Sequence, residues 1–86
     1  MEFFEVCILK LDRPSENDIN TFYKVKDELN KKYSVTVCGE TVQKFIVVPH
    51  SIHRIYYLMY RCNDLDEALG FRKEAQEMFK TMYDKG

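Results

Sequence analysis

The segment that most constrains this fold is IHRIYYLMYRC, residues 52–62, because it is apolar at both odd and even positions. Successive side chains of a strand point to opposite faces of a sheet. One face of this strand would carry Ile52, Tyr56, Leu58, Tyr60 and Cys62, and the other face would carry His53, Ile55, Tyr57 and Met59. One of these two sets must face something other than the helices that cover the sheet.

Three more strands are expected from runs of β-branched and aromatic residues. Residues 3–11 are apolar on both alternating faces, which favours a strand inside a sheet rather than at its edge. Residues 35–38 and 44–48 are short β-branched runs, and Gly39 between them can supply the positive φ of a hairpin turn. Pro49 lacks the N–H group that a central strand donates, so we place a break there before the last strand.

Two helices are marked by capping boxes. Ser15 and Asp64 each have an acidic residue three positions on, which is the pattern of a helix start. We expect helices over residues 16–32 and 65–83, each with one apolar stripe. The stripes are Ile19, Phe22, Val25, Leu29 and Tyr33 in the first helix, and Leu65, Ala68, Leu69, Ala75, Phe79, Met82 and Tyr83 in the second.

Two helices with one apolar side each, separated by strands, predict a two-layer α+β fold. We expect one domain, residues 1–86, with the order strand, helix, strand, strand, strand, helix. The last strand should cover residues 52–61. All four strands should form one mostly antiparallel sheet with both helices on one face, which leaves the other face uncovered.

The charge balance limits the classes of partner. Thirteen Lys and Arg residues against fourteen Asp and Glu residues give a net charge of −1, so the chain lacks the broad positive field of non-specific nucleic-acid binding. Three widely spaced cysteines without a CxxC pair favour reduced thiols and a cytoplasmic location, which is the host cytoplasm if the chain is phage-encoded. The N-terminal apolar run is interrupted by Glu5 and Lys10 and is too short to span a membrane.

No group of side chains has the spacing of a catalytic or metal site. His50 and His53 could offer imidazoles to zinc, but no cysteine lies close to either in sequence, so we interpret them as a turn residue and a strand residue. Cys62 lacks a recognisable acid or base partner, and the acidic side chains that follow it are explained by the start of a helix. We expect no metal, no cofactor and no enzymatic activity.

The tyrosines and arginines of the last strand are the candidate binding residues. Arg54, Tyr56, Tyr60 and Arg61 are of the types that serve at protein interfaces and at base-stacking surfaces. Tyrosine also covers a half-buried sheet well without any binding role. The three interpretations stay open, and the net charge of −1 lowers the weight of nucleic acid.

Arg72 is the fifth candidate, because helical geometry places it inside the apolar stripe of the second helix. In one interpretation its stem packs against the core and its charged head reaches the edge. In the other interpretation the guanidinium is held by the tyrosines of the last strand or by a carboxylate such as Glu5.

The run YRCNDLDEALGFRKEAQEMF contains a short pattern formed by Leu65, Asp66, Glu67, Ala68, Arg72 and Ala75. This part of the chain, residues 56–79, resembles the last strand and helix of the three-stranded DNA-binding domains of plant ethylene-response factors, which are related to domains of phage homing nucleases and integrases. The resemblance implies that a sheet reads a DNA groove with arginine and aromatic side chains, which here would be Arg54, Tyr56 and Arg61. The strand and helix at the N-terminus are foreign to that family, so no site residues are transferred from it.

We expect a small, non-enzymatic binding protein that docks its uncovered aromatic surface on another protein. Small single-domain chains without catalytic groups are typical of phage or mobile-element proteins that inhibit host defence machinery, including anti-CRISPR proteins. The alternative is a nucleic-acid-binding module that uses the sheet face. A small enzyme or a ligand-sequestering protein is the third class, and it would need a pocket. The uncovered face also leaves room for a homodimer.

Overall fold

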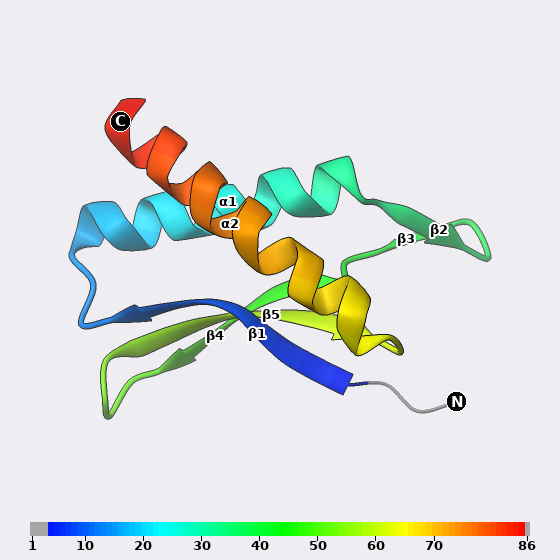
Figure 1. The fold of residues 1–86 in the computed structure, drawn as a ribbon, viewed down its shortest axis with the longest axis horizontal. Helices are drawn as coiled ribbons and strands as arrows, with labels where there is room; N and C mark the ends of the chain where they lie inside the picture. The colour runs from blue at the N-terminus through cyan, green and yellow to red at the C-terminus, as the bar shows by residue number, and fades with distance from the viewer. Residues whose placement is uncertain (1–3, 86) are drawn as a thin grey trace.

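The computed structural model describes residues 4–85, so residue 3, the expected start of the first strand, lies outside this range. The two helices are α1 (Glu16–Lys32) and α2 (Leu65–Lys85), and the strands are β1 (Phe4–Asp12), β2 (Val35–Val37), β3 (Glu40–Val42), β4 (Phe45–His50) and β5 (Ile55–Cys62). β1, β5 and β4 form one antiparallel sheet in that order, whereas β2 and β3 form a separate hairpin (Figure 1).

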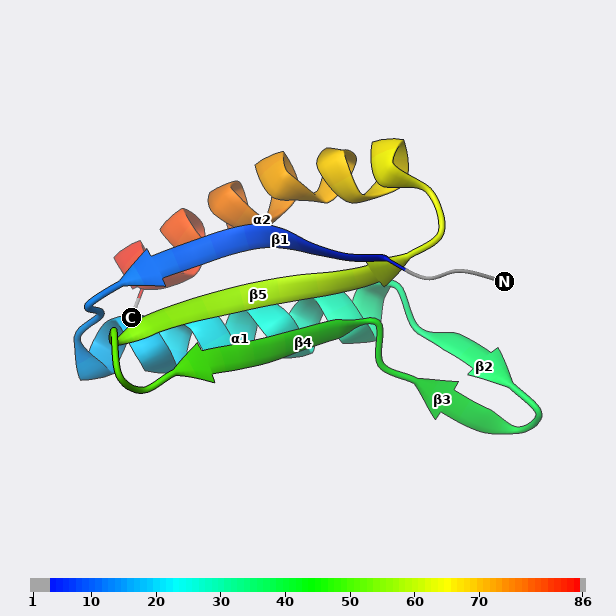
Figure 2. The ribbon, with the colours of Figure 1, turned by 90° about the horizontal axis from the view of Figure 1, so that it is seen from below.

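Both helices lie on one face of the three-stranded sheet, so the fold has two layers. Seen from below, the strands stand in front of α1 and α2, and no helix or strand of the described chain covers the near face of the sheet (Figure 2). α2 packs against β1, and α1 packs against β4. The predicted two-layer α+β fold with both helices on one face is confirmed.

The prediction of a single four-stranded sheet is wrong, because the hairpin closes earlier than expected. Its turn contains Gly39 at φ 82°, and Val35 pairs with Val42 rather than with the strand that follows. Asn30 of α1 then fixes the start of β4. Its Nδ2 donates to the carbonyl of Phe45 at 2.8 Å, and the N–H of Phe45 donates to its Oδ1 at 3.0 Å. The hairpin therefore extends beyond the end of the sheet (Figure 2).

Three strand positions also differ from the prediction. β1 is an edge strand and not an interior one. It is apolar on both sides because α2 packs against it and because a bulge adds Ile8, which is buried, to its inner side. β4 continues through Pro49, which an edge strand allows because the missing N–H group faces away from β5. β5 begins at Ile55 because residues 51–54 form the turn that joins it to β4.

The core is built around an aromatic cluster at Phe45. This ring has no exposed surface, and it lies 6.2 Å from Tyr33, 4.7 Å from Tyr60 and 5.3 Å from Phe71 between ring centroids. The cluster joins both helices to β4 and β5. The buried residues of α1 follow its predicted stripe and include Phe22, Val25 and Leu29.

The buried stripe of α2 differs in part from the predicted one. Ala68 and Ala75 have no exposed surface, whereas Leu65 and Leu69 are exposed. Phe71, which is absent from the predicted stripe, packs in the aromatic cluster instead. Small side chains let a helix approach a sheet closely, and one large ring between them fills the remaining space.

The two helix starts use different contacts. The Ser15 hydroxyl accepts from the N–H of Asp18 at 3.1 Å, and the N–H of Ser15 donates to Asp18 at 2.9 Å, so the predicted capping box of α1 is confirmed. At α2, Asp64 accepts from the N–H of Asp66 at 3.0 Å. The carboxylate of Glu67 accepts a hydrogen bond from Tyr60 instead of closing a second box.

A polar cluster at Glu74 joins the end of α1 to the middle of α2. Lys32 Nζ donates to the Glu74 carboxylate at 2.6 Å, and the Tyr33 hydroxyl donates to it at 2.7 Å. Burial alone would raise the pKa of Glu74, but the hydrogen bonds from Lys32 and Tyr33 outweigh burial and lower it. The hydrogen bond to Glu74 raises the pKa of Lys32 and the pKa of Tyr33.

Candidate binding surface

Two of the predicted binding residues, Tyr56 and Tyr60, face the helices. Tyr60 is only 2% exposed, and its hydroxyl donates to Glu67 at 2.7 Å. Burial, and then the hydrogen bond to Glu67, raises the pKa of Tyr60. Tyr56 is half-buried, with its ring edge-on to Phe22 at 6.5 Å between centroids. The expectation that these two rings meet a partner is corrected, because both belong to the side of β5 that the helices cover.

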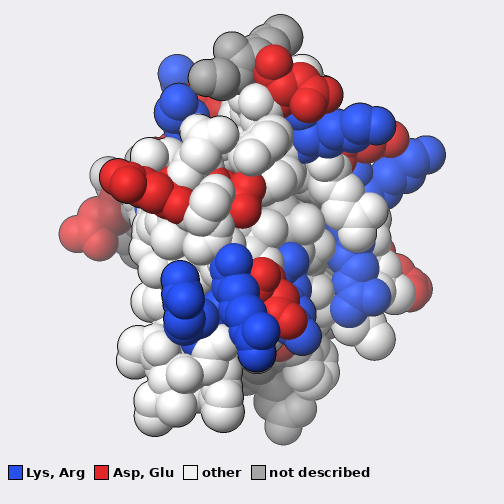
Figure 3. Space-filling model, turned by 90° about the vertical axis from the view of Figure 1, so that its left-hand side faces the viewer, with Lys and Arg blue, Asp and Glu red and all other residues white. Residues whose placement is uncertain are grey.

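Arg54 and Arg61 lie at opposite ends of β5. Arg54 has φ 54° in the turn before the strand, and its carbonyl accepts the N–H of Arg13 at 2.8 Å. The end of the molecule with this turn shows several basic side chains around an acidic one (Figure 3). Arg61 is close to the other end, where its Nε donates to Glu5 Oε1 at 3.2 Å. At about 3.3 Å a residue, the two arginines are separated by roughly 23 Å along the strand and do not form one patch.

Arg72 lies beside the edge of β1. Its Nε donates to the backbone carbonyl of Cys7 at 3.2 Å, while its side chain stays exposed. This matches the first of the two predicted arrangements, in which the charged head reaches the edge. Glu5, the expected partner in the second arrangement, pairs with Arg61 instead.

The uncovered side of the sheet carries its own apolar side chains. We define the outer face by six of them, namely Cys7 of β1, Ile46 and Val48 of β4, and Ile55, Tyr57 and Met59 of β5. Met59 pairs with Cys7 on one side and Ile46 on the other, and Tyr57 pairs with Val48. The outer face is therefore a continuous apolar strip along the middle of the uncovered side.

Tyr57 and Met59 are the central residues that the choice of candidates from sequence missed. The period of two separates them from Tyr56 and Tyr60, but it does not tell which pair the helices cover. A signal was available in Arg61, which lies on the same side of the strand as Tyr57 and Met59. A charged side chain favours the side that faces water, so its position identifies the outer face.

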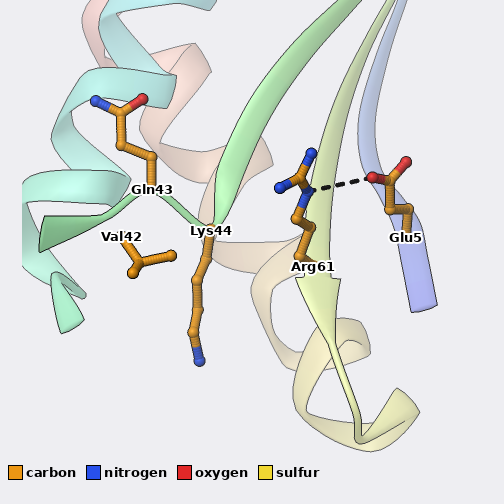
Figure 4. Close-up of a pocket in the computed structure, with 5 residues that line it drawn as sticks. All are labelled: Glu5, Val42, Gln43, Lys44 and Arg61. Carbon is orange, nitrogen blue, oxygen red and sulfur yellow. Dashed lines mark hydrogen bonds and ion pairs between the residues drawn. The ribbon is translucent and has the colours of Figure 1, made fainter. Parts of the chain in front are cut away.

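A cavity lies at the hairpin end of the outer face. It has a volume of about 480 Å³, and its described lining is Glu5, Val42, Gln43, Lys44 and Arg61 (Figure 4). The Nε of Arg61 is held by Glu5, and the terminal nitrogens of its guanidinium point away from that carboxylate (Figure 4). With two cations and one carboxylate, this end of the face attracts a negatively charged group.

The opposite end of the outer face is bordered by Asp12 of β1 and His50 of β4, which flank Ile55 in the register. The ring of His50 stacks on that of His53, with 4.8 Å between centroids. Within the described part of the chain, no three His, Cys, Asp or Glu side chains gather as metal ligands would.

The free edge of β4 offers little to a further strand. The N–H of Arg61 donates to the carbonyl of Lys44 at 2.9 Å, and hydrogen-bonded positions alternate along an antiparallel strand. Phe45, Val47 and Pro49 therefore direct their backbone groups to the free edge. Asn30 occupies both groups of Phe45, and Pro49 has no N–H group to donate.

The free edge of β1 is protected from strand addition by different contacts. By the same alternation, Cys7 directs its carbonyl away from β5, and Arg72 occupies it. Glu5, Lys10 and Asp12 are the other residues that face this edge, and charged side chains on an edge strand disfavour pairing with another strand. Neither edge of the sheet favours strand addition.

Comparison of the chain with protein-family models, with curated proteins and with solved structures finds no match. In the described residues, neither helix is long and apolar enough to cross a membrane.

Proposed function

We propose that this protein is a non-enzymatic binding protein whose outer face docks on another protein. The observation that supports the proposal most is the apolar strip centred on Tyr57 and Met59, on the side of the sheet that neither helix covers. A contiguous apolar strip rimmed by charged groups is typical of a protein interaction site. Aromatic and methionine side chains are enriched at the centres of such sites.

The distribution of charge and aromatic groups favours a protein partner over a nucleic acid. A base-stacking surface needs several exposed rings along a basic groove. Tyr57 is the one tyrosine on the outer face, because Tyr56 and Tyr60 face the helices. Arg54 and Arg61 lie at opposite ends of β5, and Arg61 is paired with Glu5. The nucleic-acid alternative is ranked second for these reasons.

The test is the substitution Tyr57→Ala, with binding measured by quantitative capture of the partner from the source cell on immobilised protein. We expect a loss of about 2 kcal/mol, or roughly 30-fold in affinity, because binding energy concentrates in large side chains that lose their water on docking. Tyr23→Ala is the matched control, since Tyr23 is an exposed tyrosine of α1. Equal capture by both variants would contradict the proposal.

The nucleic-acid alternative makes its own prediction. Arg54→Ala and Arg61→Ala would each lower the salt slope of binding by about one unit, since each phosphate contact releases about one counterion. If the protein shifts short DNA or RNA at micromolar concentration in physiological salt and captures no protein, the ranking is reversed. The narrower expectation, a phage or mobile-element inhibitor of host defence, is decided by the identity of the captured protein.

A further inference from the structure

The state of the two sheet edges limits how a partner can dock. A peptide that adds a strand needs a row of free N–H and C=O groups along one edge. In β4, Asn30 occupies Phe45 and Pro49 lacks a donor, which leaves Val47 as the one residue of that edge with both groups. In β1, Arg72 occupies Cys7 among charged neighbours. A partner that docks on this three-stranded sheet is therefore expected to bind the side chains of the outer face rather than to add a strand at an edge.

The dimensions of the outer face select among partners that bind in this way. Three strands are about 10 Å wide from first to last, and a strand of the length of β5 is about 26 Å long. About a dozen side chains point outward, whereas a standard interface uses roughly 20–30 residues a side. This area is too small for a stable homodimer formed by two such faces. It matches an α-helix, which is about 10 Å across with its side chains and covers 26 Å in about 17 residues.

We propose, resting on the function proposed above, that the outer face takes one amphipathic α-helix of the partner, laid along β5. Its apolar stripe covers Tyr57 and Met59 and completes a three-layer arrangement of helices, sheet and helix. At the hairpin end, Lys44 and Arg61 outnumber Glu5. The helix therefore presents acidic side chains, or the negative end of its dipole, to the cavity of Figure 4.

The experiment is an affinity selection with two peptide libraries displayed on phage. One library varies the exposed face of a single stable helix, and the other contains random linear peptides of about 12 residues, which can bind as strands. We expect binders from the helical library, enriched in acidic residues at one end of the apolar stripe. They should bind Tyr57→Ala at least roughly tenfold more weakly than the parent protein and should bind Tyr23→Ala as they bind the parent.

Pro49→Thr provides a second control, because it returns an N–H group to the free edge of β4. Linear peptides that bind as strands should be selected by this variant and not by the parent protein. The helix proposal is overturned if linear peptides dominate on the parent, if helical binders tolerate Tyr57→Ala, or if neither library yields binders. Linear binders that depend on Tyr57 would overturn the helix and leave the proposed function standing. Partner capture that is insensitive to Tyr57→Ala would overturn both.

Discussion

The two sides of β5 are nearly alike in sequence but differ in what the fold places against them. On the inner side, Leu58 and Tyr60 are buried under α1 and α2, whereas on the outer side Tyr57 and Met59 face no other element of the described chain. Each side has a tyrosine next to an aliphatic or thioether side chain. The difference comes from what the rest of the fold places against each side, so the residue types of a strand do not by themselves show which side is buried in the core and which side is left uncovered.

The largest expected effect comes from neighbouring residues of β4 that lie on opposite sides. Phe45→Ala should lower the free energy of unfolding by about 3–5 kcal/mol, because it empties the centre of the aromatic cluster. Ile46→Ala should cost no more than about 1 kcal/mol, because this side chain packs against no helix. Urea denaturation followed by circular dichroism measures both values. Similar losses of stability for the two variants would contradict the difference between the inner and outer faces.

A smaller effect is expected from the two tyrosine hydroxyls. Tyr60→Phe should cost about 1 kcal/mol, because it removes the hydrogen bond to Glu67 from a buried ring. Tyr57→Phe should change stability by less than about 0.5 kcal/mol, as expected for a surface position. Denaturation of the two variants at neutral pH gives the difference. A larger loss of stability for Tyr57→Phe than for Tyr60→Phe would contradict the structural role given to the Tyr60 hydroxyl.

The raised pKa of Tyr60 adds a pH dependence to the same pair. Its contribution is fully present below the ordinary tyrosine pKa of 10.0 and is lost as the pH rises above that value, because the unfolded chain then ionises and the folded chain does not. The parent protein and Tyr57→Phe should lose stability on this account above about pH 10, and Tyr60→Phe should lose less. Parallel melting curves from pH 8 to 11 test the difference.

The smallest effect concerns the polar cluster at Glu74, which holds together the two helices that cover the inner face. Glu74→Gln should cost about 0.5–1 kcal/mol, because the pair with Lys32 is partly exposed. Since the pKa of Glu74 is lowered, its contribution is present above its ordinary value of 4.5 and is lost as the pH falls below it. Asp27→Asn, which breaks the pair of Asp27 with Lys26, should leave the free energy of unfolding unchanged both above and below pH 4.5. If the free energy of unfolding of the parent protein does not fall as the pH drops below 4.5, this role of Glu74 is contradicted.

The helices and the layer arrangement could be predicted from the sequence because their signals are local. The capping box at Ser15 and the apolar stripe through Phe22 and Leu29 define α1 within one segment. The separation of the β2-β3 hairpin from the sheet could not be predicted in this way. It involves Asn30, whose side chain binds the backbone of Phe45 fifteen residues away at the start of β4. A contact of this kind leaves no periodic pattern.

The two tyrosines chosen from the sequence lie on β5 together with the outer face, but on the opposite side of the strand. The alternation of β5 separates Tyr56 and Tyr60 from Tyr57 and Met59, but packing against α1 and α2 decides which set is buried. Arg72 shows the same limit. Helical geometry places it inside the apolar stripe, but its contact with the Cys7 carbonyl depends on β1 being an edge strand. The roles of these residues follow from tertiary neighbours and not from their own segment.

The strand order β1-β5-β4 also has a consequence for how the chain folds during synthesis. Every backbone pairing of this sheet involves β5, the last strand to be made. While only the segment up to β4 has left the ribosome, α1 and the β2-β3 hairpin can form, but β1 and β4 have no strand between them to pair with. β5 can pair with β4 through the short turn at residues 51–54, but the sheet is complete only when β5 also pairs with β1, which is distant in sequence, and a long-range pairing of this kind is slow. Until then the apolar sides of β1 and β4 remain accessible to chaperones and to other nascent chains.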